Sequence, residues 1–313
     1  MNLYHYRSLN ERLIQYLRDR RMYFQSPLLF NDPFDFDLEC LRLEDRGRAK
    51  AQLNAYQGYL LAQIHRTQEA RDRMANRIRD RQSDRQEDKV PLPIPAIEIA
   101  YREHSLFTEE LRSLESDTSD ASTKLGSSWT RLRLKLAANL GVVCFSECPT
   151  QILMWSHYAD SHKGICLEFD SKQLPIRGWK KYSYHRVNYV KQRMIDVISV
   201  GYTNATLQLL TCKSTDWAYE QERRLVTIKG PGFQDTRIPA ITAITLGAKI
   251  TENPIELRTS LLSAIRQHQA DRRSVNPIEL RAAEKVSGEF SLVVRTLANV
   301  NQLASWLGVK MVK

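Results

Sequence analysis

The strongest constraint on the fold is a change of pattern at Gly141. From there on, short segments rich in β-branched and aromatic residues are bounded by Gly, Pro, Asp or Ser, as β-strands are. The predicted strands are 142–146, 164–169, 185–190, 223–228, 243–250 and 290–297. Helical patterns occur at about 149–158, 194–211, 254–268 and 300–308. Because helices and strands do not alternate strictly, we predict a mixed α+β fold and not a doubly wound sheet.

The first forty residues predict a strand, a helix and a second strand. Residues 3–6 are apolar and aromatic, Ser8 and Glu11 form a capping box that begins a helix, and residues 22–24 resume as a strand. The segment FNDPFDFD (30–37) then predicts a tight turn with side-chain capping, because Asn and Asp precede a proline.

Residues 41–140 have a different composition and predict a helical insertion. Segment 66–89 interleaves charges of both signs, which is typical of a solvated helix with i,i+4 ion pairs. The proline-rich stretch 91–95 interrupts it, and helical patterns return at 96–116 and 128–140. We therefore expect three parts: a core from 1–40 and 141–250, the insertion 41–140, and a C-terminal helix–strand–helix unit, 251–313, that completes the core.

The net charge of +10 is concentrated towards the C-terminus. Residues 223–313 hold 14 basic and 7 acidic residues, whereas 41–140 hold 18 and 15. Such an excess either attracts a polyanion or simply keeps a domain soluble. If nucleic acid is a partner, we expect it at the basic C-terminal third. If a protein is a partner, we expect it at the charged helices of 41–140.

Several classes of protein are excluded by what the sequence lacks. No run of eighteen apolar residues predicts a membrane span, and charge follows the start too early for a secretory signal. The five cysteines are an odd number, unlike a small disulfide framework. We expect a cytoplasmic protein without membrane contact. The glycine-rich dinucleotide and P-loop motifs, the serine elbow and the H-E-x-x-H motif are also absent.

One cluster combines soft metal ligands, namely Cys144, Cys148, His157, His162 and Cys166. Sulfur and imidazole suit zinc, but the spacing contains no paired C-x-x-C. Two of the cysteines fall within apolar strands, where a free cysteine behaves as a small hydrophobic residue. We expect no metal here, and no cysteine–histidine nucleophile.

Glu220 and Glu222 stand two residues apart next to the predicted strand 223–228, so we expect both on one side of that strand. Two such carboxylates repel one another unless a cation or a substrate donor lies between them. The pair is either a solvated edge, ion-paired with Arg223 and Arg224, or a carboxylate site that faces a cleft. Lys213 is a further candidate ion-pair partner.

Four segments carry a resemblance to a bacterial family catalogued as domain of unknown function 2971. They are LYHYRS (3–8), FNDPFD (30–35), MWSHYADSHKGICLEF (154–169) and the pattern K-x-x-x-W-x-x-E-x-E-R-R at 213–224. The resemblance covers about residues 1–40 and 141–250 and leaves out the helical insertion. It implies membership of a family but no activity.

A looser resemblance is to the ADP-ribosyltransferases. LYHYRS is similar to their first, histidine-bearing strand, CFSE (144–147) to a later strand, and the pair of Glu220 and Glu222 to their glutamate motif. The resemblance implies a split β-sheet core of mixed and antiparallel strands, with NAD⁺ as substrate and without a metal. It also implies a role for each of six residues: Glu222 stabilises the sugar cation, Glu220 orients the acceptor, His5 and Arg7 bind ribose and pyrophosphate, and Trp155 or Tyr158 stacks on nicotinamide.

The resulting hypothesis is an NAD⁺-consuming ADP-ribosyltransferase or NAD glycohydrolase, acting as a toxin or anti-phage effector on nucleic acid or protein. Two alternatives stay open at this stage. One is a non-catalytic module that binds nucleic acid or a partner protein. The other is a metal-dependent nuclease with Asp32, Asp35, Glu220 and Glu222 as hard oxygen ligands.

Overall fold

A computed structural model describes residues 1–19, 21–37, 40–42, 49–83, 94–173, 182–196, 202–234, 241–270 and 278–310. Its centre is an eight-stranded sheet with the strand order β14-β13-β12-β5-β1-β4-β10-β6. The strands are β1 (Asn2–Arg7), β4 (Gly141–Ser146), β5 (Ile165–Asp170), β6 (Tyr182–Arg186), β10 (Glu222–Thr227), β12 (Ile241–Leu246), β13 (Glu279–Lys285) and β14 (Leu292–Leu297). All neighbours are antiparallel except β12 and β13, which are parallel. The predicted mixed α+β class is confirmed.

One face of the sheet is covered by α1 (Glu11–Asp19), α8 (Ile255–Ala270) and α9 (Val300–Trp306). The spacing of Leu13, Ile14 and Leu17 places three apolar side chains on the inner side of α1. They join sheet residues in the larger hydrophobic core, together with apolar side chains of α8 and α9. The short helix α5 (Ile152–Tyr158) lies against the opposite face, where Tyr6 and Cys166 contact it.

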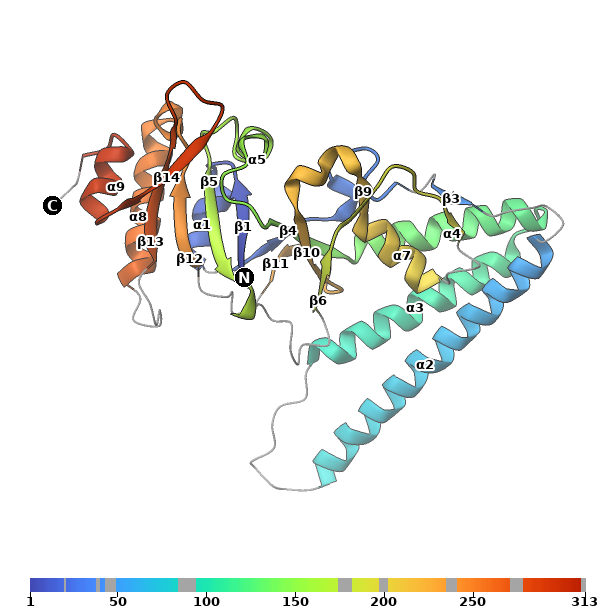
Figure 1. Cartoon of the computed structure of the whole chain (residues 1–313). Coiled ribbons are helices and arrows are strands. Elements are labelled where there is room, and N and C mark those ends of the chain that lie inside the picture. The colour runs from blue at the N-terminus through green and yellow to red at the C-terminus, as the bar shows by residue number, and fades with distance from the viewer. Residues whose placement is uncertain are drawn as a thin grey trace.

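The insertion forms a bundle of three helices, α2 (Ala49–Ser83), α3 (Ile94–Ser116) and α4 (Ala121–Ala138). Figure 1 shows α2 and α3 running side by side away from the sheet. A second hydrophobic core joins the bundle to α7 (Tyr202–Thr211) and to Val142 and Val226 of the sheet. Three helices occupy most of the segment predicted as a helical insertion, and residues 84–93, which include most of the proline-rich break, lie outside the described residues.

Short elements complete the described chain. Three two-stranded sheets pair β2 (Tyr23–Phe24) with β11 (Gly232–Phe233), β3 (Leu41–Arg42) with β8 (Ile195–Asp196), and β7 (Asn188–Val190) with β9 (Cys212–Ser214). The 3₁₀ helices are η1 (Pro27–Leu29), η2 (Ser171–Gln173), η3 (Thr215–Glu220) and η4 (Ile250–Glu252).

Some element predictions need correction. Segment 185–190 is not one strand, because Val187 leaves the ladder between β6 and β7 and donates its N–H to the Glu222 carbonyl at 3.0 Å. The strand predicted over 243–250 ends at Leu246, where Gly247 turns the chain into η4. The helix predicted over 194–211 begins only at Tyr202, after β8, and residues 197–201 lie outside the described part. Strand β13 was not predicted at all.

The sheet has a seam between β1 and β4. Six residue pairs join β1 to β5, and six join β10 to β4, but the register between β1 and β4 is a single pair, Tyr4 with Ser146. Beyond that pair a side chain replaces the missing backbone contacts, since His5 Nδ1 lies 2.8 Å from the Cys144 carbonyl oxygen. The main sheet is therefore continuous in order but open along this line.

Candidate active site

A cavity of about 300 Å³ lies at the seam. Residues of β1, β4, α5 and β10 line it, together with the loop that follows β2. Of the six residues predicted to form a site, the cavity brings together His5, Arg7, Tyr158, Glu220 and Glu222, although they come from distant parts of the chain.

Trp155 does not line this cavity. Its side chain is fully buried, its indole N–H donates to the Pro149 carbonyl at 3.0 Å, and the ring of Tyr6 meets it edge-on with centroids 5.2 Å apart. Trp155 is thus a core residue that holds α5 on the sheet. Of the two aromatic residues predicted to stack on nicotinamide, Tyr158, three residues along the same helix, is the one that lines the cavity.

The two glutamates converge in a different way from the one predicted. Glu220 is not on the strand, because it ends η3, and Glu222 is the first residue of β10. Between them Gln221 has a left-handed backbone, with φ of 46°, which turns the chain sharply from helix to strand. This turn, and not strand periodicity, brings the two carboxylates to the same cavity.

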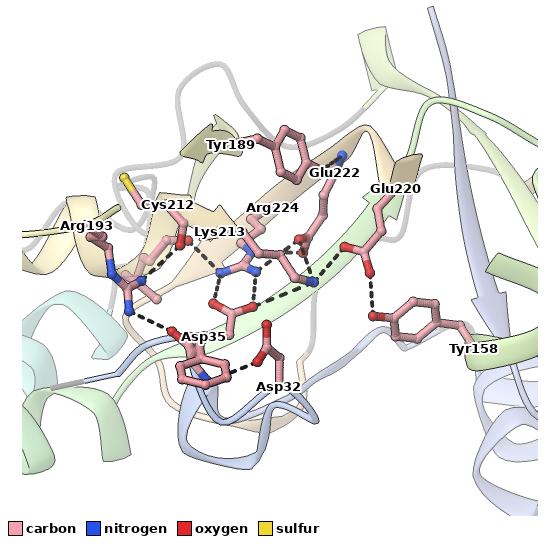
Figure 2. A network of polar contacts seen from close by, with 12 residues as sticks. Asp32, Asp35, Tyr158, Tyr189, Arg193, Cys212, Lys213, Glu220, Glu222 and Arg224 are labelled. Atoms are coloured by element: carbon pink, nitrogen blue, oxygen red, sulfur yellow. Dashed lines mark hydrogen bonds and ion pairs between the residues drawn. The ribbon is translucent and has the colours of Figure 1, made fainter. Parts of the chain in front are cut away.

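Lys213 is the cation between the two glutamates (Figure 2). Its Nζ lies 2.6 Å from Glu220 Oε2 and 3.6 Å from Glu222 Oε2. It also lies 4.7 Å from the ring centroid of Trp217. The sequence-based expectation of Lys213 as an ion-pair partner is confirmed, and it explains how two buried carboxylates are tolerated side by side.

Arg224 fixes Glu222 against the loop that follows β2 (Figure 2). Its guanidinium donates to both oxygens of Asp35, at 3.0 and 2.5 Å, and to both oxygens of Glu222, at 2.8 and 3.0 Å. A fifth bond, of 2.8 Å, goes to the Leu210 carbonyl. The predicted turn at 30–37 is confirmed, since Asp32 Oδ1 accepts from the Phe34 N–H at 2.9 Å.

The two glutamates differ in protonation behaviour. Burial opposes the ionisation of Glu222, but the charge and hydrogen bonds of Arg224 outweigh it and lower the pKa to about 2. Burial raises the pKa of Glu220, and the nearby charge of Glu222 adds to this, while Lys213 acts in the opposite direction. The Tyr158 hydroxyl donates to Glu220 Oε1 at 2.5 Å. Glu222 is a fixed anion, whereas burial makes Glu220 the one of the two carboxylates that binds a proton more readily.

His5 is a neutral hydrogen-bonding group in this cavity. Burial lowers its pKa to about 3, and the neighbouring positive charge of Arg7 contributes to the same shift. Because Nδ1–H donates to the Cys144 carbonyl oxygen, Nε2 is left as an acceptor.

Arg7 is the cation of the cavity that has no carboxylate to pair with among the described residues. It lies near Tyr16 and Tyr23, and burial lowers its pKa. The other buried cations, Lys213 and Arg224, are fully engaged with carboxylates. The cavity therefore has an acidic end and, at Arg7, a basic one.

The acidic end is already balanced by protein cations, which bears on the metal alternative. Asp35, Glu220 and Glu222 are paired with Lys213 or Arg224. Within the described ranges, no group of three or more Asp, Glu, His or Cys residues is arranged to hold a metal ion. Three of the four proposed carboxylate ligands are thus committed to ammonium and guanidinium partners, an arrangement that does not suit Mg²⁺. The fourth, Asp32, accepts from the Phe34 N–H.

One contributor to the site escaped the sequence analysis, namely Tyr189, which accepts the Glu222 backbone N–H through its hydroxyl at 2.8 Å. Arg224 was expected as an ion-pair partner at a solvated edge, but it is buried and binds both Asp35 and Glu222. A signal for its burial existed, because it precedes the apolar run Leu225–Val226 in a strand, and a buried charge requires a partner. No local pattern marks Tyr189.

Comparison with known proteins gives one match, and it covers the centre of the site. Residues 154–225 match the model of a family described as protein of unknown function (DUF2971). The stretch that matches DUF2971 contains Tyr158, Lys213, Glu220, Glu222 and Arg224, whereas His5, Arg7 and Asp35 precede it. No curated protein and no solved structure matched the chain. No helix in the described part of the chain is both long and apolar enough to cross a membrane.

Proposed function

We propose that the cavity binds NAD⁺ and that the protein cleaves the bond between nicotinamide and ribose, transferring ADP-ribose to an acceptor or to water. The observation that carries this proposal is the bipolar lining, with three carboxylates that share two cations at one end and, at the other, the Arg7 guanidinium, which has no carboxylate partner among the described residues. The nicotinamide half of NAD⁺ has the matching polarity, with a pyridinium cation at one end and phosphate at the other.

The size of the cavity supports the same assignment. Its volume of about 300 Å³ lies at the lower end of ligand pockets. That volume suits the nicotinamide–ribose–phosphate half of the dinucleotide and leaves the remainder outside. Arg7 would bind a phosphate through charge-assisted hydrogen bonds, and His5 Nε2 would accept from a ribose hydroxyl. Tyr158 offers an aromatic face for nicotinamide.

The chemistry follows from charge. When the C1′–N bond breaks, its electron pair moves to the nicotinamide nitrogen, and positive charge develops on the ribose. The ionised Glu222, held by Arg224, stabilises that charge more strongly in the transition state than in the ground state. The acceptor then attacks C1′ and loses its proton to Glu220, which burial makes the more basic of the two carboxylates.

The test is release of nicotinamide from NAD⁺ by the purified full chain, alone and with cell extract as a source of acceptor. Glu222→Gln should reduce the release by at least about 1000-fold, because it keeps the shape of the side chain and removes the charge. NAD⁺ affinity, measured by calorimetry, should change far less.

A matched control is Glu168→Gln. Glu168 is also a buried glutamate bonded to an arginine, Arg281, but it does not line the cavity. This variant should release nicotinamide at the wild-type rate. Wild-type protein that binds no NAD⁺, or equal loss of activity in both variants, would overturn the proposal.

A further inference from the structure

A second hollow lies on the outer side of α8, away from the seam. Its volume is about 510 Å³, and none of its lining residues lines the cavity between β1 and β4. The polar side chains that line it are Thr259, Ser263, Arg266, Gln267 and Lys310. Thr259, Ser263 and the adjacent pair of Arg266 and Gln267 follow one another at three or four residues along α8 and are exposed. Leu261 and Ile265 of the same helix face the core.

The lining of this groove, which we call the α8 groove, is rich in donors and contains no carboxylate. Within the described part of the chain, neither Arg266 nor Lys310 forms an ion pair. Arg223, Arg224, Lys249, Arg281 and Arg295 are by contrast paired with acidic side chains. Lys229, Arg258 and Lys285 also lack an acidic partner in the described part, but none of them lines the groove. The groove therefore combines two unpaired positive charges with further hydrogen-bonding side chains on one surface.

We propose that the α8 groove binds the phosphate backbone of a nucleic acid. From Thr259 to Ala270 the helix is about 16 Å long, at about 1.5 Å per residue. A strand of duplex carries one phosphate per about 3.4 Å of axis, so the groove spans several consecutive phosphates. An elongated polyanion fits it better than a single phosphate ion.

The same lining argues against a membrane surface as the partner. Leu262 is buried, Ala270 offers only a methyl group, and the other lining residues are polar. Binding at a lipid interface needs large exposed apolar side chains beside the cations. The groove supplies charge and hydrogen-bond donors without such anchors, which is the composition of a backbone-binding surface.

Fluorescence anisotropy with a labelled duplex of mixed sequence, titrated at several salt concentrations, tests the proposal on the full chain. The logarithm of the binding constant should fall linearly with the logarithm of salt concentration. In the double variant Arg266→Gln/Lys310→Gln, the slope should become shallower by about 2, because two phosphate contacts are lost. Both side chains are exposed, so thermal unfolding should be unchanged.

The matched control is Lys50→Gln/Lys191→Gln, which removes the same charge from exposed positions elsewhere. This variant should keep the wild-type slope. A wild type that does not bind the duplex, equal slopes in the two double variants, or binding to anionic vesicles in place of the duplex would overturn the proposal. Because the groove and the seam cavity share no residue, the outcome does not depend on NAD⁺ chemistry.

Discussion

Arg224 ties three distant parts of the chain together, and the site depends on it. Its five hydrogen bonds reach the loop after β2, the end of α7 and the start of β10. Its side chain is only 1 % exposed, so its bonding partners must offset the free-energy cost of burying the charge. Removing one partner from a buried pair of this kind typically costs about 3–5 kcal/mol. The same contacts that stabilise the fold therefore hold Glu222 in one orientation.

Arg7 differs from Arg224 because its charge has no acidic partner among the described residues. Arg7→Gln should weaken NAD⁺ binding by about 10- to 100-fold, the loss expected for one charge-assisted hydrogen bond or two. The control is Arg12→Gln, since Arg12 is exposed, lies over the Tyr23 ring and does not line the cavity. Calorimetry checks both. Equal affinities in the two variants would mean that Arg7 is no part of the binding site.

Sequence reasoning at the residue scale identified the members of the site better than their geometry. The sequence indicated Lys213 as a candidate ion-pair partner for one of the glutamates, and in the structure its ammonium group lies between both. The left-handed turn at Gln221 was not foreseen, since glutamine carries no local signal for a positive φ. Trp155 was assigned to the cavity because an exposed and a buried aromatic look the same in a sequence.

At the scale of elements, the close approach of strand ends shapes the cavity. Gly164 stands just before β5, and a Cβ atom there would lie 2.1 Å from the Arg7 carbonyl oxygen and 2.9 Å from the Ala159 Cα. Both neighbours are backbone atoms that cannot rotate away. The end of β1, and with it Arg7, can approach β5 only because this residue has no side chain.

Gly164→Ala should therefore lower the free energy of unfolding by about 1–3 kcal/mol, the usual cost of overpacking. The matched substitution is Gly126→Ala in α4, where the added Cβ meets nothing within 4 Å. That change should raise stability by up to about 1 kcal/mol, because alanine favours a helix over glycine. Urea unfolding of both variants measures the difference. A stable Gly164→Ala protein would show that β1 can shift freely.

Strand β13 could not be predicted, because its own sequence does not favour a strand. Strand β13 reads ELRAAEK, and Glu, Ala and Lys are all depleted in strands. It is a strand because β12 and β14 flank it on both sides and Ala282 and Ala283 fit a fully buried position. By contrast, the apolar strands β4, β5 and β10 were predictable, since their own composition already favours extended structure.

At the scale of the whole molecule, the buried charges couple folding to pH. The pKa of Glu222 in the folded protein is about 2, below its ordinary value of 4.5. Its contribution to stability is therefore complete above pH 4.5 and is lost as the pH falls from 4.5 towards about 2. A plot of unfolding free energy against pH should fall in that window for the wild type and be flatter for Glu222→Gln. Parallel curves from chemical denaturation would show that Arg224 does not hold the carboxylate ionised.

The two proposed sites lie apart in the fold. The seam cavity is next to the core that the helices of the insertion share with Val142 and Val226, whereas the α8 groove has no lining residue in common with that cavity. The division of the chain into a helical segment and a segment rich in strands was predictable, because the residue pattern changes sharply at Gly141. The seam between β1 and β4 was not predictable, because it depends on the pairing of strands about 140 residues apart in the sequence.

The single residue pair between β1 and β4 has one more consequence. When two strands are paired along their whole length, separating them breaks a row of backbone hydrogen bonds. Substitutions therefore cannot change the distance between such strands in small steps. Between β1 and β4 the imidazole of His5 spans the gap instead, and its size sets the distance between the two strands. Substitutions at position 5 alone can therefore change the width of the seam cavity in small steps, while the strand pairings on either side stay intact.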